Sequence, residues 1–233
     1  ISRLVKERRE RLGAIQAASS LLNIPIQKRA GAPDLTMLLL QKKVVQPLSN
    51  QPQRKPEYAI STEDYENILQ VIRHEGRSFE RTPATFAKHD EEELRDILLA
   101  HLNGHYHGQA ASEAFRKKGK TDICIEFENR SAFVAECKVW KGEKLLMESL
   151  DQLLGYLTWR DVKTSLILLN KEVAGFQHVQ SKIEEFLSRS PSFLQFAPCQ
   201  EQGEWRAIFR SREDPDRKVT VHVFLFNLYV LKS

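Results

Sequence analysis

The sequence has no long hydrophobic run and few cysteines. No stretch of about eighteen apolar residues occurs, so we expect no membrane-spanning helix. The three cysteines are an odd number without a Cys-x-x-Cys pair, which argues against a disulfide framework or zinc ribbon and favours a reducing, cytoplasmic setting. Secretory signals, Gly-rich phosphate loops and internal repeats are also missing. With 41% hydrophobic and 28% charged residues, the composition is that of a soluble globular protein.

Charge is unevenly distributed along the chain. The net charge is +4, but residues 1–60 hold eleven Lys and Arg against four Asp and Glu. A basic arm suits a nucleic-acid enzyme, and a solvated helix face explains the same charges equally well. Prolines and polar residues in 46–57 predict a linker. We therefore expect a basic, mostly helical segment and linker over 1–57, then one domain over 58–233. Because the chain starts with Ile1, we expect an upstream domain in a longer protein.

The most informative stretch is residues 117–140, which is typical of two paired strands. Apolar and polar residues alternate over 123–128, and Asn129 to Ser131 resemble a hairpin turn. In the apolar run that follows, Glu136 and Lys138 stand two residues apart and so point to the same side of a strand. For this tripeptide alone, a structural Glu–Lys pair at a sheet edge is the favoured interpretation. The acid at Asp122 on the preceding strand favours a catalytic or metal-binding role for these residues instead.

Two carboxylates and an ammonium group suit metal-assisted phosphate chemistry. Two carboxylates hold a hard cation such as Mg²⁺ through oxygen, and a neighbouring ammonium group steadies a water or the charge on phosphorus. Residues 143–159 then predict an amphipathic helix that carries Gln152 and Tyr156 on one face. The apolar run 164–169 predicts a strand buried on both sides.

The order G-K-T-D, E-C-K, Q-x-x-x-Y and strand resembles the PD-(D/E)xK nuclease superfamily, in particular its RecB/Mrr-like branch. Thr121 stands where the family name has proline. The resemblance implies an α/β restriction-endonuclease-like core, a central mixed sheet flanked by helices, and dependence on Mg²⁺ or Mn²⁺. It implies that Asp122 and Glu136 are metal ligands, with the carbonyl of Cys137 as a third ligand, and that Lys138 is the catalytic lysine. Gln152 and Tyr156 would orient this lysine or contact the nucleic-acid backbone.

A further acid is expected near the metal, and two candidates stand out. Glu91 begins a predicted helix over 90–102, although the helix dipole explains an acidic first turn equally well. Glu113 lies nine residues before Asp122, in a region (103–115) that predicts a first strand, and is slightly favoured because a neighbouring strand holds a ligand more directly. The basic cluster Lys117, Lys118 and Lys120 could cradle the scissile strand or be an ordinary charged turn.

Three histidines raise the alternative of zinc. His101, His105 and His107 include a His-x-x-x-His spacing, which suits zinc on a helix. Because Asn103 and Gly104 are expected to end the helix between the first pair, surface histidines are the favoured interpretation.

The remaining elements frame this core. We expect a helix over 61–76 capped by Ser61 or Thr62, a helix over 172–188, and C-terminal strands over 193–197, 205–211 and 219–229 that extend or cover the sheet. Packing is the favoured role of Trp140 and Trp159.

Together these patterns predict a Mg²⁺- or Mn²⁺-dependent nuclease, with an endonuclease favoured and DNA as the partner, in bacterial restriction, phage defence or repair. A homodimer is left open. The alternatives are a catalytically silent nucleic-acid- or partner-binding module of the same fold, and an RNase or structure-specific resolvase.

Overall fold

The structure is a computed structural model that describes residues 60–106, 110–116, 119–127, 130–158 and 163–231. The predicted N-terminal segment and linker, and the side chains of Lys117, Lys118 and Lys120, lie outside this description, as does Trp159. None of the described helices is long and apolar enough to cross a membrane.

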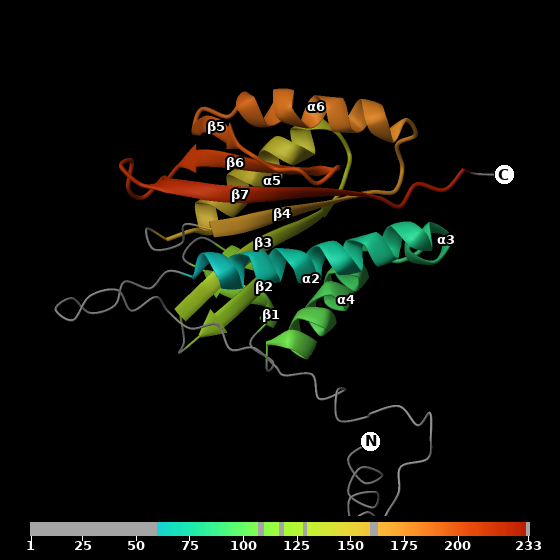
Figure 1. The fold of residues 1–233 in the computed structure, drawn as a ribbon, viewed down its shortest axis with the longest axis horizontal. Coiled ribbons are helices and arrows are strands. Elements are labelled where there is room, and N and C mark those ends of the chain that lie inside the picture. Colours follow the sequence, from blue (N-terminus) through green and yellow to red (C-terminus); the bar gives the residue numbers. More distant parts are fainter. Residues whose placement is uncertain (1–59, 107–109, 117–118, 128–129, 159–162, 232–233) are drawn as a thin grey trace, which may run out of the picture. The chain divides into compact units, whose positions relative to one another are not determined.

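A seven-stranded mixed sheet forms the centre of the described fold (Figure 1), in the order β1-β2-β3-β4-β7-β6-β5. The strands β1 to β3 form an antiparallel meander, β3, β4 and β7 run parallel, and β6 and β5 complete the other edge antiparallel. Their bounds are β1 Ala110–Arg116, β2 Gly119–Phe127, β3 Arg130–Val139, β4 Lys163–Asn170, β5 Phe193–Ala197, β6 Glu204–Arg210 and β7 Lys218–Asn227. The predicted α/β class with a mixed central sheet is confirmed, and the C-terminal strands extend the sheet.

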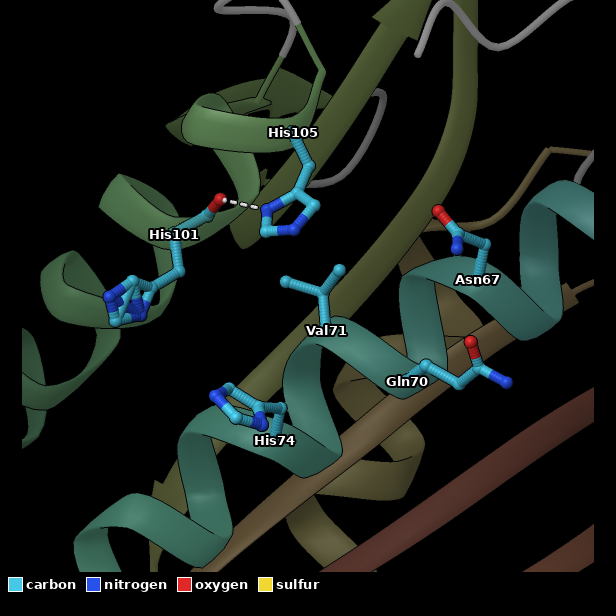
Figure 2. Close-up of a pocket in the computed structure, with 6 residues that line it drawn as sticks. All are labelled: Asn67, Gln70, Val71, His74, His101 and His105. Carbon is cyan, nitrogen blue, oxygen red and sulfur yellow. Dashed lines mark hydrogen bonds between the residues drawn. The ribbon is translucent and has the colours of Figure 1, made fainter. Parts of the chain in front are cut away.

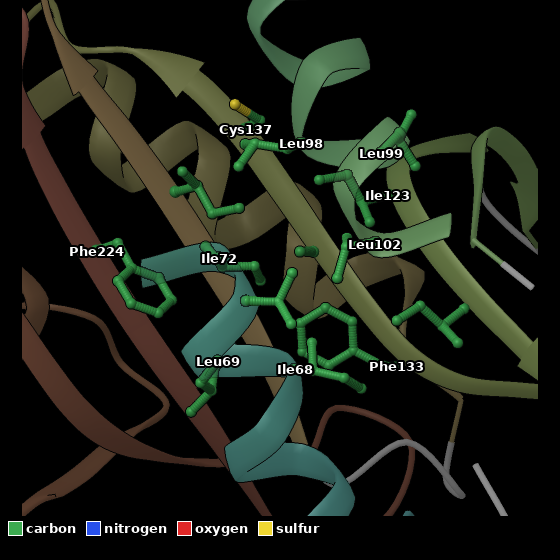
Figure 3. Close-up of a cluster of buried hydrophobic side chains, with 14 of the residues drawn as sticks. Ile68, Leu69, Ile72, Leu98, Leu99, Leu102, Ile123, Phe133, Cys137 and Phe224 are labelled. Atoms are coloured by element: carbon green, nitrogen blue, oxygen red, sulfur yellow. The ribbon is translucent and has the colours of Figure 1, made fainter. Parts of the chain in front are cut away.

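Helices cover both faces of the sheet (Figure 1). One face carries α2 (Thr62–Arg81), the short α3 (Pro83–Phe86) and α4 (Glu91–His105), and the other carries α5 (Glu143–Tyr156) and α6 (Phe176–Ser188). Ile68 and Ile72 of α2 and Leu98 of α4 meet Phe133 and Phe224 of the sheet in the first core (Figure 3). Trp140 is buried in the second core, as predicted. Both faces of the sheet are therefore packed against helices.

Local capping sets where α2 and α4 begin. Ser61 caps α2 by accepting a hydrogen bond from Asp64 N, as predicted. Asp90 caps α4 in a capping box with Glu93. The two predicted helix ends were wrong, because α2 continues through Gly76 to Arg81 and α4 continues through Gly104 to His105. The predicted strand over 103–115 is correspondingly shorter and starts at Ala110.

Gly76 is required by close packing instead of by a helix end. A Cβ added there would lie 2.1 Å from Cζ of Phe226. This ring has no free space to move into, because it is 3% exposed and stacks on Phe224 with 5.5 Å between ring centroids. We expect Gly76→Ala to lower the free energy of unfolding by about 1–3 kcal/mol, measured by urea denaturation.

Gly104→Ala is the matched control for this substitution. Gly104 also lies in a helix, but a Cβ added there would have no neighbouring atom within 4 Å, so alanine should stabilise by about 0.5–1 kcal/mol through helix propensity. Equal effects of the two substitutions would contradict the packing explanation.

Candidate active site

Four predicted residues meet at the end of β3. The register that pairs Ile123 with Ala135 places Asp122 of β2 beside Glu136 of β3. The Nζ atom of Lys138 lies 2.8 Å from Asp122 Oδ2, 3.1 Å from Glu136 Oε1 and 3.0 Å from Glu91 Oε1. One ammonium group therefore contacts three carboxylates that come from two strands and the first turn of α4.

Backbone groups of β3 fix two of these carboxylates. Asp122 Oδ2 accepts a hydrogen bond from Cys137 N at 3.0 Å, and Glu91 Oε2 accepts one from Val139 N at 2.9 Å. Charged acceptors bound to backbone N–H groups make short, strong hydrogen bonds. The capping box at Asp90 fixes the helix turn from which Glu91 projects. The acids are thus held by the strand that carries the lysine.

Glu136 is the least satisfied group of the site. Its side chain is fully buried, and among the described residues neither carboxylate oxygen has a hydrogen-bond partner; its contact with Lys138, at 3.1 Å, is an ion pair. Burial, and next the charge of Asp122, raise the pKa of Glu136 to about 7. A buried carboxylate without hydrogen-bond donors is costly unless a cation compensates it. The Lys138 ammonium group supplies part of this compensation, and a metal ion bound here would supply more.

Lys138 remains protonated in this environment. Burial opposes its charge, but the carboxylates of Glu136, Asp122 and Glu91 outweigh burial and raise its pKa. A lysine with a raised pKa is a poor general base, so its contribution is electrostatic. The three carboxylates and one ammonium sum to −2 when Glu136 is ionised, a charge that a divalent cation would balance.

Arg95 is a neighbour of the site that the sequence did not reveal. Its Nη1 atom lies 3.9 Å from Asp122 Oδ1, and the side chain is largely buried. Arg95 follows Glu91 by four residues, so both project from the same side of α4. The four-residue spacing of Glu91 and Arg95 could have indicated that both side chains lie on one side of the helix. It does not indicate which strand the arginine reaches, because that depends on how α4 packs.

Of the two candidates for the further acid, the structure brings Glu91 to the site. Glu113 lies opposite Asp122 in the register of β1 and β2, between the pairs Ser112–Ile123 and Ala114–Thr121. Its side chain lies outside the described part of the structure, as do those of Lys117, Lys118 and Lys120. A role for Glu113 therefore stays a prediction.

Gln152 and Tyr156 contact each other, with Gln152 Nε2 donating to Tyr156 Oη at 2.6 Å. Both lie on α5, which packs against β2 and β3. Among the described residues, neither hydrogen-bonds to Lys138, whose partners are the three acids. Orientation of the lysine by this pair is thus not seen, and contact with nucleic acid stays a prediction. The same holds for the carbonyl of Cys137, whose side chain is buried in the first core.

The histidines of α4 line a cavity of about 360 Å³ between α2 and α4 (Figure 2). Because α4 continues to His105, His101 and His105 do share a helix, and the expected helix break between them was wrong. Their rings nevertheless have different partners. His105 Nδ1 donates to the carbonyl of His101 at 3.0 Å, and His101 Nδ1 lies 2.5 Å from Glu75 Oε2. The pair does not form a shared metal site in this structure, and His107 lies outside the described residues.

No family model matches the chain, and comparisons with curated proteins and with solved structures also gave no match. The function therefore has to be inferred from the chemistry of the site.

Proposed function

We propose that this chain is a metal-dependent nuclease of the PD-(D/E)xK superfamily that hydrolyses phosphodiester bonds in DNA. The observation that carries the proposal is the convergence of Asp122, Glu136 and Glu91 on Lys138, with the buried Glu136 carboxylate lacking a hydrogen bond from any described residue. Structural ion pairs at a sheet edge do not need a third acid or a buried carboxylate without donors.

The topology supports the restriction-endonuclease-like core that the motif resemblance implies. The helix α4 precedes the meander β1 to β3, and α5 crosses over to β4, which lies parallel to β3. This order places the ends of β2 and β3 beside the first turn of α4. The acids and the lysine of the motif therefore come from neighbouring elements of one compact unit.

The residues have distinct roles in this proposal. Asp122 and Glu136 would hold Mg²⁺ or Mn²⁺, and Glu91 would complete the oxygen ligands or bind a metal-bound water. The ion, when bound, would lower the pKa of a water and polarise the phosphoryl group. Lys138, released from one or more carboxylates, would stabilise the charge that develops on the phosphate. Arg95, whose Nη1 atom lies 3.9 Å from Asp122 Oδ1, would help to orient this carboxylate.

DNA cleavage provides the direct test. Supercoiled plasmid should be nicked by the protein with Mg²⁺ or Mn²⁺ and left intact with EDTA, and Asp122→Asn should abolish nicking. Glu92→Gln is the matched control, because Glu92 is an exposed neighbour of Glu91 on α4. Single-stranded, branched and RNA substrates, tested alongside, would identify an RNase or a structure-specific resolvase. Equal activity of wild type and Asp122→Asn would reject the proposal.

The second candidate function is a catalytically silent nucleic-acid-binding module. The observation that favours it is the position of Lys138, whose ammonium group already occupies the point where the three carboxylates meet. Binding of DNA that is unchanged by metal and by Asp122→Asn, without cleavage of any substrate, would support this alternative.

A further inference from the structure

A second group of ligand-type side chains lies on β6 and β7, separated from β3 by β4 and independent of the proposed nuclease site. Cys199 precedes β6, Glu204 is its first residue, and His222 lies in β7. The Cys199 Sγ, a Glu204 carboxylate oxygen and a His222 ring nitrogen lie within 4.8 Å of one another. Within the described part of the chain, this is the one such trio of Cys, His, Asp and Glu side chains. Zinc binds such atoms at about 2.0–2.3 Å, so small shifts would let the three share one ion.

Two of the three side chains are already fixed. His222 is fully buried, and its Nε2 atom lies 2.7 Å from Glu204 Oε2. Arg73 of α2 binds the same carboxylate with two hydrogen bonds, from Nε to Oε1 at 2.6 Å and from Nη2 to Oε2 at 2.7 Å. Support of a ligand by a neighbouring hydrogen bond is the usual second layer of a metal site. The rigid pair leaves Cys199, which is partly exposed, as the ligand that can adjust.

One ring nitrogen of His222 remains available for its proton. Among the described residues, the buried Nδ1 atom of His222 has no hydrogen-bond partner. It can therefore carry the ring proton when Nε2 binds an ion, and the thiol proton of Cys199 leaves to solvent.

We propose that Cys199, Glu204 and His222 form a binding site for a thiophilic divalent ion of the Zn²⁺ class. A thiolate, an imidazole and a carboxylate select such an ion over Mg²⁺, which prefers oxygen ligands throughout. The ion would enter from the partly exposed side of Cys199 and keep one position for water. It would tie the segment before β6 to β7 and, through Arg73, to α2.

Positive neighbours limit the affinity of this site. Arg73 and Arg206 lie close enough to His222 and Cys199 to influence their pKa values, and both would oppose a cation. Arg206 is itself paired with Glu66 at 2.8 Å, which offsets part of its charge. Thiolate, carboxylate and divalent ion sum to zero charge, whereas the empty site with a neutral thiol carries −1, so loading removes the negative charge that faces Arg73. We therefore expect reversible binding, weaker than at a closed site of four protein ligands.

Cobalt(II) substitution of the full chain tests the site. Co²⁺ should produce a thiolate-to-cobalt charge-transfer band in the near ultraviolet, and Zn²⁺ should displace it. Cys199→Ser should remove the band, while Asp122→Asn, at the proposed nuclease site, should keep it. His222→Gln should remove it as well, with circular dichroism as a check of folding. Absence of the band in a folded wild-type protein, or its persistence in Cys199→Ser, would overturn the proposal.

Discussion

Replacing Lys138 by methionine is expected to lower the rate of metal-dependent DNA cleavage by about 100- to 1000-fold, the usual effect of removing one preorganised electrostatic contact to a transition state. The reason is that Lys138 is protonated and lies within 3.1 Å of all three acids that the proposal assigns to the metal site. Metal binding should survive, because the substitution leaves the carboxylates in place and removes a competing cation. Cleavage rates and Mn²⁺ titrations, measured on the same preparations, separate the two effects.

Lys144→Met is the control for this experiment. Lys144 is a lysine of α5 whose side chain is 90% exposed and whose ion pair with Glu148 is long, at 3.8 Å. Its replacement should leave cleavage unchanged. If Lys138→Met cleaves DNA as fast as Lys144→Met, the lysine has no role in catalysis.

Glu136→Gln is expected to make the metal-free protein more stable at pH 8 while abolishing metal-dependent activity. Glu136 is buried without a hydrogen bond from the part of the chain that the structure describes, and its ionised form is disfavoured by burial and by Asp122. A neutral amide removes that cost, which amounts to a few kcal/mol. Opposite effects on stability and activity are typical of a residue that is kept for function.

The raised pKa of Glu136 also predicts the direction in which stability changes with pH. The pKa of Glu136 is about 7 in the folded protein, against an ordinary value of 4.5. Between these values the folded state binds more protons than the unfolded state, so this group makes stability fall as pH rises from about 4.5 to about 7. Metal-free Glu136→Gln should lack that contribution, as measured by thermal unfolding from pH 5 to pH 8. Glu92→Gln should show the pH profile of the wild type. If Glu136→Gln also shows the wild-type profile, the pKa of the Glu136 carboxyl is not raised in the folded protein.

In the wild-type protein, bound metal should counteract the loss of stability that Glu136 causes as pH rises. An ion binds the deprotonated carboxylate, so Mn²⁺ should raise the melting temperature more at pH 8 than at pH 6. In Glu136→Gln the increase should be largely lost at both pH values.

The proximity of Asp122, Glu136 and Lys138 could be predicted from the sequence because its geometry is local. Alternation in β2 and β3 and the short turn between them suffice to bring Asp122 beside Glu136, and a spacing of two residues puts Lys138 on the same side. Glu91 could be named as a candidate but not chosen over Glu113. Its position depends on how α4 packs against the end of β3, which no local pattern encodes.

Glycines were interpreted less well for a similar reason. Gly76 and Gly104 both resemble helix ends, yet both lie inside helices. At Gly76 the deciding contact is the ring of Phe226, 150 positions later in the chain. The network of Arg73, Glu204 and His222 joins α2, β6 and β7; Arg73 lies 131 positions from Glu204 and Glu204 lies 18 from His222, so no local spacing connects them.

The most direct test of the central claim is the location of a bound ion. Crystals grown with Mn²⁺ should show an anomalous difference peak in contact with carboxylate oxygens of Asp122 and Glu136, with the Lys138 ammonium group moved away from at least one of them. A site that stays free of Mn²⁺ at saturating concentration, with Lys138 still bound to all three acids, would contradict the account.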